Sequence, residues 1–361
     1  HCDRITAYFS AADVGETKMI FEQIATGGCY SYLLGCAESH AAVLIDPHLA
    51  QIDHYLGLAA QKGLTIHYLL DTHTHADHFS AAKELGCRLG APVVTSRASP
   101  APYSSFRLDD GEILRVGSLR LKALHTPGHT RDSMCVVAED RIFTGDTLLI
   151  GGTGRTDLPT GDPGALYDSL FQIVLRLPPD LLVYPAHDYK GRSHSTIGVE
   201  IESNPRLQVR DRDSFIEMMN RLNLAAPTHL TEALRTNMSG GKTVEQVLAE
   251  AASRIPFVTL GELAERVAAD TLDMILLDVR EKDAFDTGHI PGAQHLPRGQ
   301  LELRVNKGLP DPTRRILVAC EFGRISTLAA ATLRELGYTR VAALDGGMQA
   351  WREAGYPMTR N

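Results

Sequence analysis

The sequence predicts two α/β domains joined by a linker, and two observations lead to this fold class. The 361 residues exceed what one hydrophobic core usually serves. Short apolar runs alternate with helical patterns up to about residue 185, and a second alternation begins at Phe257. We therefore expect an N-terminal domain over residues 1–236, a linker over 237–256 and a C-terminal domain over 257–361.

The first domain is expected to contain a sheet covered by helices on both sides. Several of its apolar runs are uninterrupted, which is typical of strands that are buried on both faces. The predicted strands cover residues 42–45, 67–70, 92–95, 119–124, 133–137, 141–144 and 181–184. The predicted helices cover residues 52–62, 80–89 and 165–176, and Asp162 followed by Pro163 is a start signal for the last of them.

The second domain is expected to be a small α/β domain with a parallel sheet. Its predicted strands cover residues 274–278, 315–319 and 341–344. Its predicted helices cover residues 260–268, 327–336 and 348–354. Strands that alternate with helices in this way are typical of parallel sheets, because a parallel pair needs a crossover connection.

The composition excludes several classes of protein. The chain is 43% hydrophobic and 22% charged, which is ordinary for a soluble globular protein, and no apolar stretch reaches the roughly 18 residues that span a bilayer. The formal net charge of -8, without a dense Lys/Arg cluster, argues against nucleic acid as a partner. The six cysteines are scattered and form no Cys-x-x-Cys pair, which favours a reducing compartment, and we expect the protein in the cytoplasm.

A cluster of potential metal ligands follows the strand predicted at 67–70. The run that begins where this strand ends reads Asp71-Thr72-His73-Thr74-His75-Ala76-Asp77-His78. Three later predicted strands also lead into polar loops, which contain His129, Asp146 and His187. Ligands on loops that a rigid sheet positions can form an open metal site, and four such loops together predict one.

This arrangement resembles the metallo-β-lactamase superfamily over roughly residues 20–220. The resemblance implies an αββα sandwich with the metal site at one edge of its paired sheets. In that superfamily one metal would be held by His73, His75 and His129, a second by Asp77, His78 and His187, and Asp146 would touch both. All seven positions are filled, so the motif by itself permits a binuclear zinc thioester hydrolase of the glyoxalase II kind.

Two further segments are similar to one branch of the superfamily, the persulfide dioxygenases. They are Gly154-Arg155-Thr156-Asp157 and Pro185-Ala186-His187-Asp188-Tyr189. The resemblance implies one Fe(II) per chain on His73, His129 and Asp146, a two-His-one-carboxylate set that leaves positions open for water, O₂ and substrate sulfur. His75, Asp77, His78 and His187 would then orient these ligands or hold a second metal, because the ligand types alone do not exclude two zincs.

The same resemblance places glutathione near Arg155, Thr156 and Tyr189. Arg155 is the expected partner of a substrate carboxylate, because its planar guanidinium makes bidentate contacts with such groups. Thr153 stands where many relatives have Cys, so a redox role of that Cys does not carry over. A homodimer is also implied by the resemblance.

A single cysteine marks the expected site of the second domain. Cys320 ends the strand predicted at 315–319, and Ser326 is placed to cap the helix predicted at 327–336. Such a loop presents backbone N–H groups and a helix N-terminus to the sulfur, which favours the thiolate and binds anions. Arg324 adds a positive charge that can hold thiosulfate or stabilise a cysteine persulfide.

Three signatures around this cysteine resemble the rhodaneses, over about residues 257–361. They read Leu277-Asp278-Val279-Arg280, Gly288-His289-Ile290-Pro291-Gly292-Ala293 and Asp345-Gly346-Gly347-Met348-Gln349-Ala350-Trp351. The five residues between Cys320 and Ser326 match the short loop of sulfurtransferases, whereas related phosphatases have a longer one. The resemblance implies sulfur transfer by Cys320 and Arg324. Glu321 departs from the common Arg-rich loop and leaves the preferred donor open.

Together the two resemblances predict a bifunctional enzyme of sulfur metabolism. The first domain would oxidise glutathione persulfide with O₂ to sulfite and glutathione. The second would move sulfane sulfur between thiosulfate and glutathione through a Cys320 persulfide. Two alternatives stay open: a binuclear zinc thioester hydrolase, and a rhodanese module that only carries or docks a persulfide.

Overall fold

Two units, His1–Gly241 and Lys242–Asn361, make up the chain. The computed structural model describes residues 18–188, 190–222, 224–225 and 230–360. The division between the units lies inside the stretch expected as a linker, while the domain limits at 236 and 257 stay predictions. Within the described ranges no helix is both long enough and apolar enough to cross a membrane.

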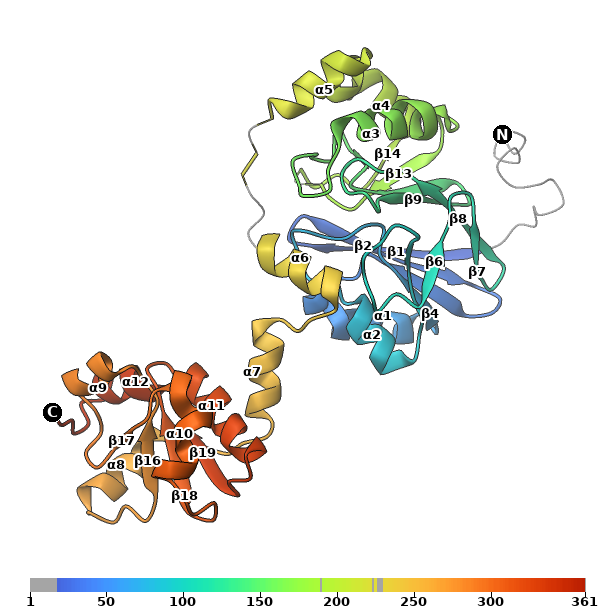
Figure 1. Ribbon diagram of the computed structural model, residues 1–361. Coiled ribbons are helices and arrows are strands. Elements are labelled where there is room, and N and C mark those ends of the chain that lie inside the picture. The colour runs from blue at the N-terminus through green and yellow to red at the C-terminus, as the bar shows by residue number, and fades with distance from the viewer. Residues whose placement is uncertain (1–17, 189, 223, 226–229, 361) are drawn as a thin grey trace. The chain divides into compact units, whose positions relative to one another are not determined.

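Two mixed six-stranded sheets form the centre of the first unit (Figure 1). The first has the order β1-β2-β3-β4-β5-β6, with β1 (Met19–Thr26), β2 (Cys29–Cys36), β3 (Ala41–Ile45), β4 (Thr65–Leu70), β5 (Val93–Ser96) and β6 (Phe106–Leu108). The second has the order β14-β13-β10-β9-β8-β7, with β7 (Ile113–Val116), β8 (Leu119–His125), β9 (Met134–Ala138), β10 (Arg141–Gly145), β13 (Leu182–Pro185) and β14 (Ser195–Thr196). A small hairpin, β11 (Leu148–Leu149) and β12 (Gly152–Thr153), lies beyond β10 in the sequence.

Helices cover the outer face of each sheet, so the unit has four layers (Figure 1). The first sheet packs against α1 (Ile52–Gln61) and α2 (Ala82–Leu89), and the second against α3 (Pro163–Asp168), α4 (Ile197–Ser203) and α5 (Arg212–Asn220). A third core fills the space between the sheets. The predicted αββα sandwich is confirmed.

Strand β3 illustrates why the predicted strands are apolar throughout. Val43 and Ile45 lie in the core between the two sheets, whereas Ala42 and Leu44 lie in the core under α1 and α2. Successive side chains of a strand point to opposite faces, and here both faces are covered. An uninterrupted apolar run is the consequence.

The first hairpin of the unit, β1 with β2, was not predicted. Gly27 and Gly28 join the strands, with Thr26 opposite Cys29, and their φ values are 58° and 94°. Positive φ at both positions of a two-residue turn is typical of a type I′ hairpin and favours glycine. The Gly-Gly pair between two apolar runs was the signal that could have revealed it.

The helix predicted at 165–176 begins as its start signal indicates but is not regular. The Asp162 side chain accepts hydrogen bonds from the N–H groups of Gly164 and Ala165, and α3 begins at Pro163. The chain then continues as a π turn (Ser169–Ile173) and a 3₁₀ turn (Val174–Arg176). The predicted extent is close, but only the part up to Asp168 is α-helical.

A five-stranded parallel sheet forms the centre of the second unit. Its order is β15-β19-β18-β16-β17, with β15 (Phe257–Val258), β16 (Ile275–Asp278), β17 (Gln294–His295), β18 (Arg315–Ala319) and β19 (Arg340–Leu344). One face packs against α7 (Val244–Ala252), α10 (Leu301–Gly308) and α11 (Arg324–Glu335), and the other against α8 (Leu260–Ala268) and α12 (Gly347–Glu353). The predicted parallel α/β domain is confirmed, although β15, β17, α9 (Lys282–Thr287) and α10 were not predicted.

Most of the stretch expected as a linker is folded into one unit or the other. Asn237 lies in α6 (Leu230–Ser239) of the first unit and is buried. Ala251 of α7 and the following Ile255 lie in a core of the second unit. Ser239, Gly240 and Gly241 had indicated the linker, and the helical pattern at 244–252 within it could have packed on either domain. The structure places that helix, α7, in the second unit.

The variant Phe143→Ala is expected to destabilise the first unit by about 3–5 kcal/mol, because it removes a fully buried ring from the core between the sheets. The chain's one tryptophan, Trp351, is fully buried in the second unit. In urea unfolding, the circular dichroism transition of the first unit should move to lower urea while the tryptophan emission transition stays in place. Equal shifts of both signals would contradict independent unfolding of the units.

Candidate metal centre and sulfur-transfer loop

Four strands of the first unit lead to one group of polar side chains. β4 leads to His73, β8 to His129, β10 to Asp146 and β13 to His187. His73, His129 and Asp146 each offer a ligand atom, and these three atoms lie within 4.8 Å of one another. The rings of His73 and His129 are 4.9 Å apart and nearly perpendicular, and His129 Nε2 lies 3.5 Å from Asp146 Oδ2. Three of the predicted ligands therefore converge.

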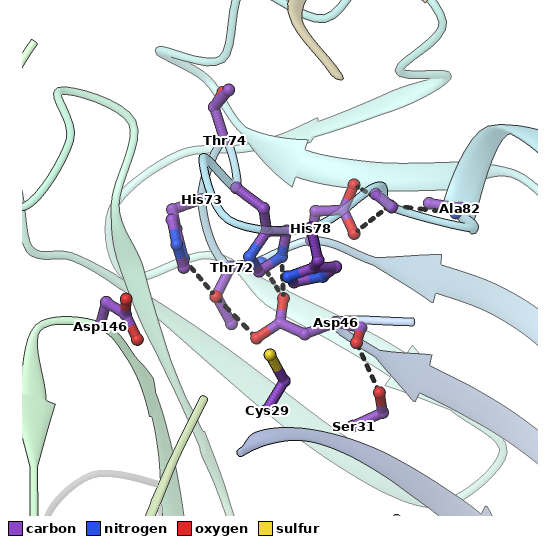
Figure 2. A network of polar contacts seen from close by, with 12 residues as sticks. Cys29, Ser31, Asp46, Thr72, His73, Thr74, His78, Ala82 and Asp146 are labelled. Carbon is purple, nitrogen blue, oxygen red and sulfur yellow. Dashed lines mark hydrogen bonds and ion pairs between the residues drawn. The ribbon is translucent and has the colours of Figure 1, made fainter. Parts of the chain in front are cut away.

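Hydrogen bonds fix the orientation of both histidines in this group. Thr72 Oγ1 donates to Asp46 Oδ2 at 2.8 Å, so it accepts from His73 Nδ1 at 3.0 Å (Figure 2). His129 Nδ1 donates to the carbonyl oxygen of Arg155 at 2.8 Å. In both rings the proton is thus on Nδ1, and the lone pair of Nε2 is available. Such outer partners are typical of metal-binding histidines.

One buried nitrogen of this group, His73 Nε2, is placed as a metal ligand would be. His73 Nε2 is buried and has no hydrogen-bond partner among the described residues. A buried polar atom without a partner is unfavourable, and a bound cation would satisfy it. Burial, and then the neighbouring His75 and His129, lower the pKa of His73 well below its ordinary value, which keeps the imidazole neutral as a ligand must be.

His187 links Asp146 to Asp77. Its Nδ1 lies 2.6 Å from Asp146 Oδ1 and its Nε2 lies 2.9 Å from Asp77 Oδ2. Burial lowers the pKa of His187, but the charge and hydrogen bonds of the two carboxylates outweigh it and raise the pKa well above its ordinary value. Burial raises the pKa of Asp146, but the charge and hydrogen bond of His187 lower it overall. His187 thus holds Asp146 ionised and in place.

The remaining predicted ligands fall into two neighbouring groups. Asp77, His78 and His187 are joined by Cys29, whose Sγ lies 3.4 Å from Asp77 Oδ2. His75 lies instead with Asp46 and Asp71, with its Nε2 3.2 Å from Asp46 Oδ1 and its Nδ1 without a partner in the described part of the chain. Cys29 was not predicted, because a lone cysteine in a strand carries no local signal of a site.

Asn237 was also missed, because it was assigned to the linker. Its Nδ2 donates to the backbone carbonyls of His75 and His78, both at 2.9 Å, and its Oδ1 accepts from the N–H of Ser80 at 3.1 Å. The Tyr103 hydroxyl donates to the Asn237 carbonyl at 2.9 Å. One buried amide therefore fixes the backbone of the histidine loop from about 160 residues further along the chain.

Of the three residues predicted to bind glutathione, the structure describes Arg155 and Thr156. The guanidinium of Arg155 makes two 2.6 Å contacts with Asp157, and it also donates to the Ala225 carbonyl at 2.7 Å. The backbone carbonyl of Arg155 accepts the hydrogen bond from Nδ1 of His129, one of the three converging residues. Thr156 is buried. Tyr189 lies outside the described residues.

In the second unit the Cys320 thiol faces the first turn of α11. The backbone N–H of Ser326 donates to Cys320 Sγ at 3.1 Å. The predicted capping role of Ser326 is wrong, because α11 begins at Arg324 after Gly323, and the Ser326 hydroxyl donates to the Gly323 carbonyl at 2.9 Å. Gly323 has φ of 82°, which lets the loop turn directly into the helix.

The two charged side chains of this loop are both paired. Glu321 contacts Arg352 and lies 3.2 Å from Arg280, and these two cations lower its pKa. Arg324, predicted to stabilise the persulfide, lies 2.7 Å from Glu245 on α7. That pair is exposed, so Arg324 can leave it at little energetic cost.

Comparison with known families defines the class of each unit. Residues 24–187 match the metallo-beta-lactamase superfamily, and residues 259–354 match the rhodanese-like domain. The "Persulfide dioxygenase ETHE1, mitochondrial" of Homo sapiens is 39% identical over 227 residues, which cover 62% of this chain and 88% of that protein. The chain therefore combines a metallo-β-lactamase-type domain with a rhodanese domain.

Two solved structures extend this comparison. ETHE1 from Myxococcus xanthus is 42% identical with a TM-score of 0.61, over 62% of this chain and 100% of that one. A metallo-beta-lactamase from Staphylococcus aureus, at 24% identity and TM-score 0.59, covers 92% of this chain and 99% of its own, and it supports the fold alone. The chain belongs to the ETHE1 persulfide dioxygenase family and carries a C-terminal rhodanese domain.

Proposed function

We propose that the first unit oxidises glutathione persulfide to sulfite and glutathione, with one Fe(II) per chain held by His73, His129 and Asp146. The observation that carries this proposal is that ligand atoms of these three residues converge, while the hydrogen bonds of both imidazoles at Nδ1 leave Nε2 available for a metal. A two-His-one-carboxylate set leaves coordination positions free, and Fe(II) bound there supplies the chemistry by which O₂ reacts with a persulfide.

The residues of the chain serve this reaction mainly by orientation. Thr72 and the Arg155 carbonyl set the two imidazole rings, and His187 holds the Asp146 carboxylate. The burial of His73 and His129 restricts water around the ligands. In the overall reaction one O₂ and one water are consumed with each glutathione persulfide, and glutathione, sulfite and two protons are released.

Oxygen uptake with glutathione persulfide tests this proposal. Protein purified anaerobically, with measured metal content, should consume O₂ in proportion to iron up to about one iron per chain. The alternative is the binuclear zinc hydrolase, for which all seven superfamily positions are present. Two zincs in the active protein, thioester cleavage and no O₂ uptake by iron-replete protein would reject the dioxygenase and support that alternative.

We propose for the second unit that Cys320 carries sulfane sulfur as a persulfide, with thiosulfate and glutathione as the exchanging pair. The support is the backbone N–H of Ser326 directed at the thiol, at the start of a helix whose dipole favours negative charge. Arg324 would leave Glu245 to contact the bound sulfur. A unit that only docks a persulfide would be loaded at Cys320 but would not turn over.

We propose further that the protein is a cytoplasmic homodimer. Cys29, Cys36, Cys87, Cys135 and Cys320 are all free thiols, which supports a reducing compartment. Sedimentation at twice the chain mass of 39.4 kDa would establish the dimer, and sedimentation at the single mass would reject it.

A further inference from the structure

We infer that the Cys320 loop prefers an organic persulfide to thiosulfate as sulfur donor, and that Glu321 and Phe322 set this preference. The inference rests on the proposed sulfur transfer through Cys320, and it names the substrate class of that site. Two features of residues 320–326 carry it: the balance of charge and the exposed apolar side chains.

The charges of this loop, of its ion-pair partners and of Asp278, which pairs with the buried partner Arg280, cancel. Three cations face three anions, and they are Arg280, Arg324 and Arg352 with Asp278, Glu245 and Glu321. Thiosulfate concentrates two negative charges on a small ion, so it gains from an excess of positive charge near the sulfur. This set of described residues offers no such excess.

The negative charge of Glu321 is fixed in the loop. Its partner Arg280 is almost fully buried, with 5% of its side chain exposed. Arg280 is itself held by Asp278, at 2.6 Å, and by the Gly288 carbonyl, at 2.8 Å. Arg324 can leave its exposed partner and approach a substrate, whereas Glu321 would have to give up ion pairs with both Arg280 and Arg352 to move away. An incoming dianion therefore meets Glu321 next to Cys320.

Two apolar side chains on the same loop remain exposed. Phe322 is 64% exposed and Ile325 is 50% exposed, and they follow Cys320 by two and five residues. A single exposed apolar residue is ordinary, but here two lie within one short loop that also carries the thiol. A donor with a carbon skeleton can cover them and gain hydrophobic free energy, which an inorganic ion cannot do.

The transfer step itself is balanced without any further reactant. The Cys320 thiolate attacks the terminal sulfur of the persulfide, the new S–S bond forms on Cys320, and the old S–S bond breaks. The organic thiolate leaves and takes up a proton from water. A second thiol can accept the sulfur by the reverse of this step, so no net oxidation or reduction occurs.

Anaerobic loading of the full chain tests the inference, because the dioxygenase reaction stops without O₂. Mass spectrometry would follow the gain of one sulfur on Cys320, with glutathione persulfide or thiosulfate as donor. Each second-order rate constant is divided by that of the same donor with free cysteine, which removes intrinsic reactivity. The wild-type ratio should favour glutathione persulfide, and a ratio that favours thiosulfate would overturn the inference.

Two variants with matched controls locate the cause. Glu321→Arg should raise the thiosulfate constant about tenfold and change the persulfide constant less, because it replaces a negative by a positive charge. Phe322→Ala should lower the persulfide constant about fivefold and leave thiosulfate unchanged. The controls Glu302→Arg and Leu303→Ala, on exposed positions of α10, should change neither constant.

The outcomes separate the inference from the proposed function. Equal effects of Phe322→Ala on both donors, or no gain in thiosulfate loading by Glu321→Arg, would overturn the donor preference. No loading of wild-type Cys320 by either donor would instead reject the proposed sulfur transfer. The emission of Trp351, buried in this unit, checks that each variant is folded, and Glu321→Gln, which keeps the shape of the side chain, should give a smaller gain in the same direction.

Discussion

The variant Cys320→Ser is expected to lower sulfur transfer by at least about a thousandfold, because the hydroxyl of serine is a far weaker nucleophile than a thiolate. The Ser326 N–H would still find an acceptor, so the fold of the loop should survive. Oxygen consumption with supplied glutathione persulfide should stay within about twofold of wild type, since Cys320 and the proposed metal ligands belong to different units.

A second cysteine provides the control for this variant. Cys87 is an exposed free thiol on α2, and Cys87→Ser should leave both activities unchanged. Loss of oxygen consumption in Cys320→Ser would show that the two activities are not separable. Unchanged transfer in the same variant would remove Cys320 from the reaction altogether.

The variant Asp146→Asn is expected to lose bound iron and to lower oxygen uptake by more than about a hundredfold. This loss is larger than the loss expected when only a hydrogen-bond partner of a metal ligand is removed. The amide has no charge for the metal or for His187, whose Nδ1 lies 2.6 Å from the carboxylate. Iron content measured on the purified protein reads the change directly, independently of activity. Loading of Cys320 should be retained.

Asp53→Asn is the matched control, because Asp53 is an almost fully exposed carboxylate on α1. It should keep both iron and oxygen uptake. Full iron content in Asp146→Asn would remove this carboxylate from the ligand set. Lost oxygen uptake with full iron would assign Asp146 a role in the reaction other than holding the metal.

The sequence predicted those parts of the fold that depend on local pattern. β18 and α8 have the predicted bounds, and the buried strand β3 differs by one residue, because apolar runs and turn residues are read within a few positions. The first hairpin was missed although its Gly-Gly turn was visible, and the irregular helix after Asp168 had no such signal.

The sequence predicted the residues of the candidate site that follow strands, but not those brought in by long-range contacts. His73, His129 and Asp146 converge as expected, because each follows a strand whose end could be located. Cys29 and Asn237 could not be predicted, since their contacts join segments about 50 and 160 residues apart in the chain. The ion pairs of Glu321 and Arg324 likewise depend on partners from other elements, so the charge balance of the sulfur-transfer loop required the structure.

The position of Asn237 limits where the chain can be cut. A fragment that ended at residue 236 would keep every predicted ligand but would lose the amide that holds the carbonyls of His75 and His78. The resulting loop would have two free carbonyls and one free N–H in a buried place, and its backbone at His75 and His78 would lose this support. The second unit begins at Lys242, only five residues after Asn237. A laboratory dissection that keeps Asn237 on the histidine loop therefore has only residues 238–241 in which to cut between the units.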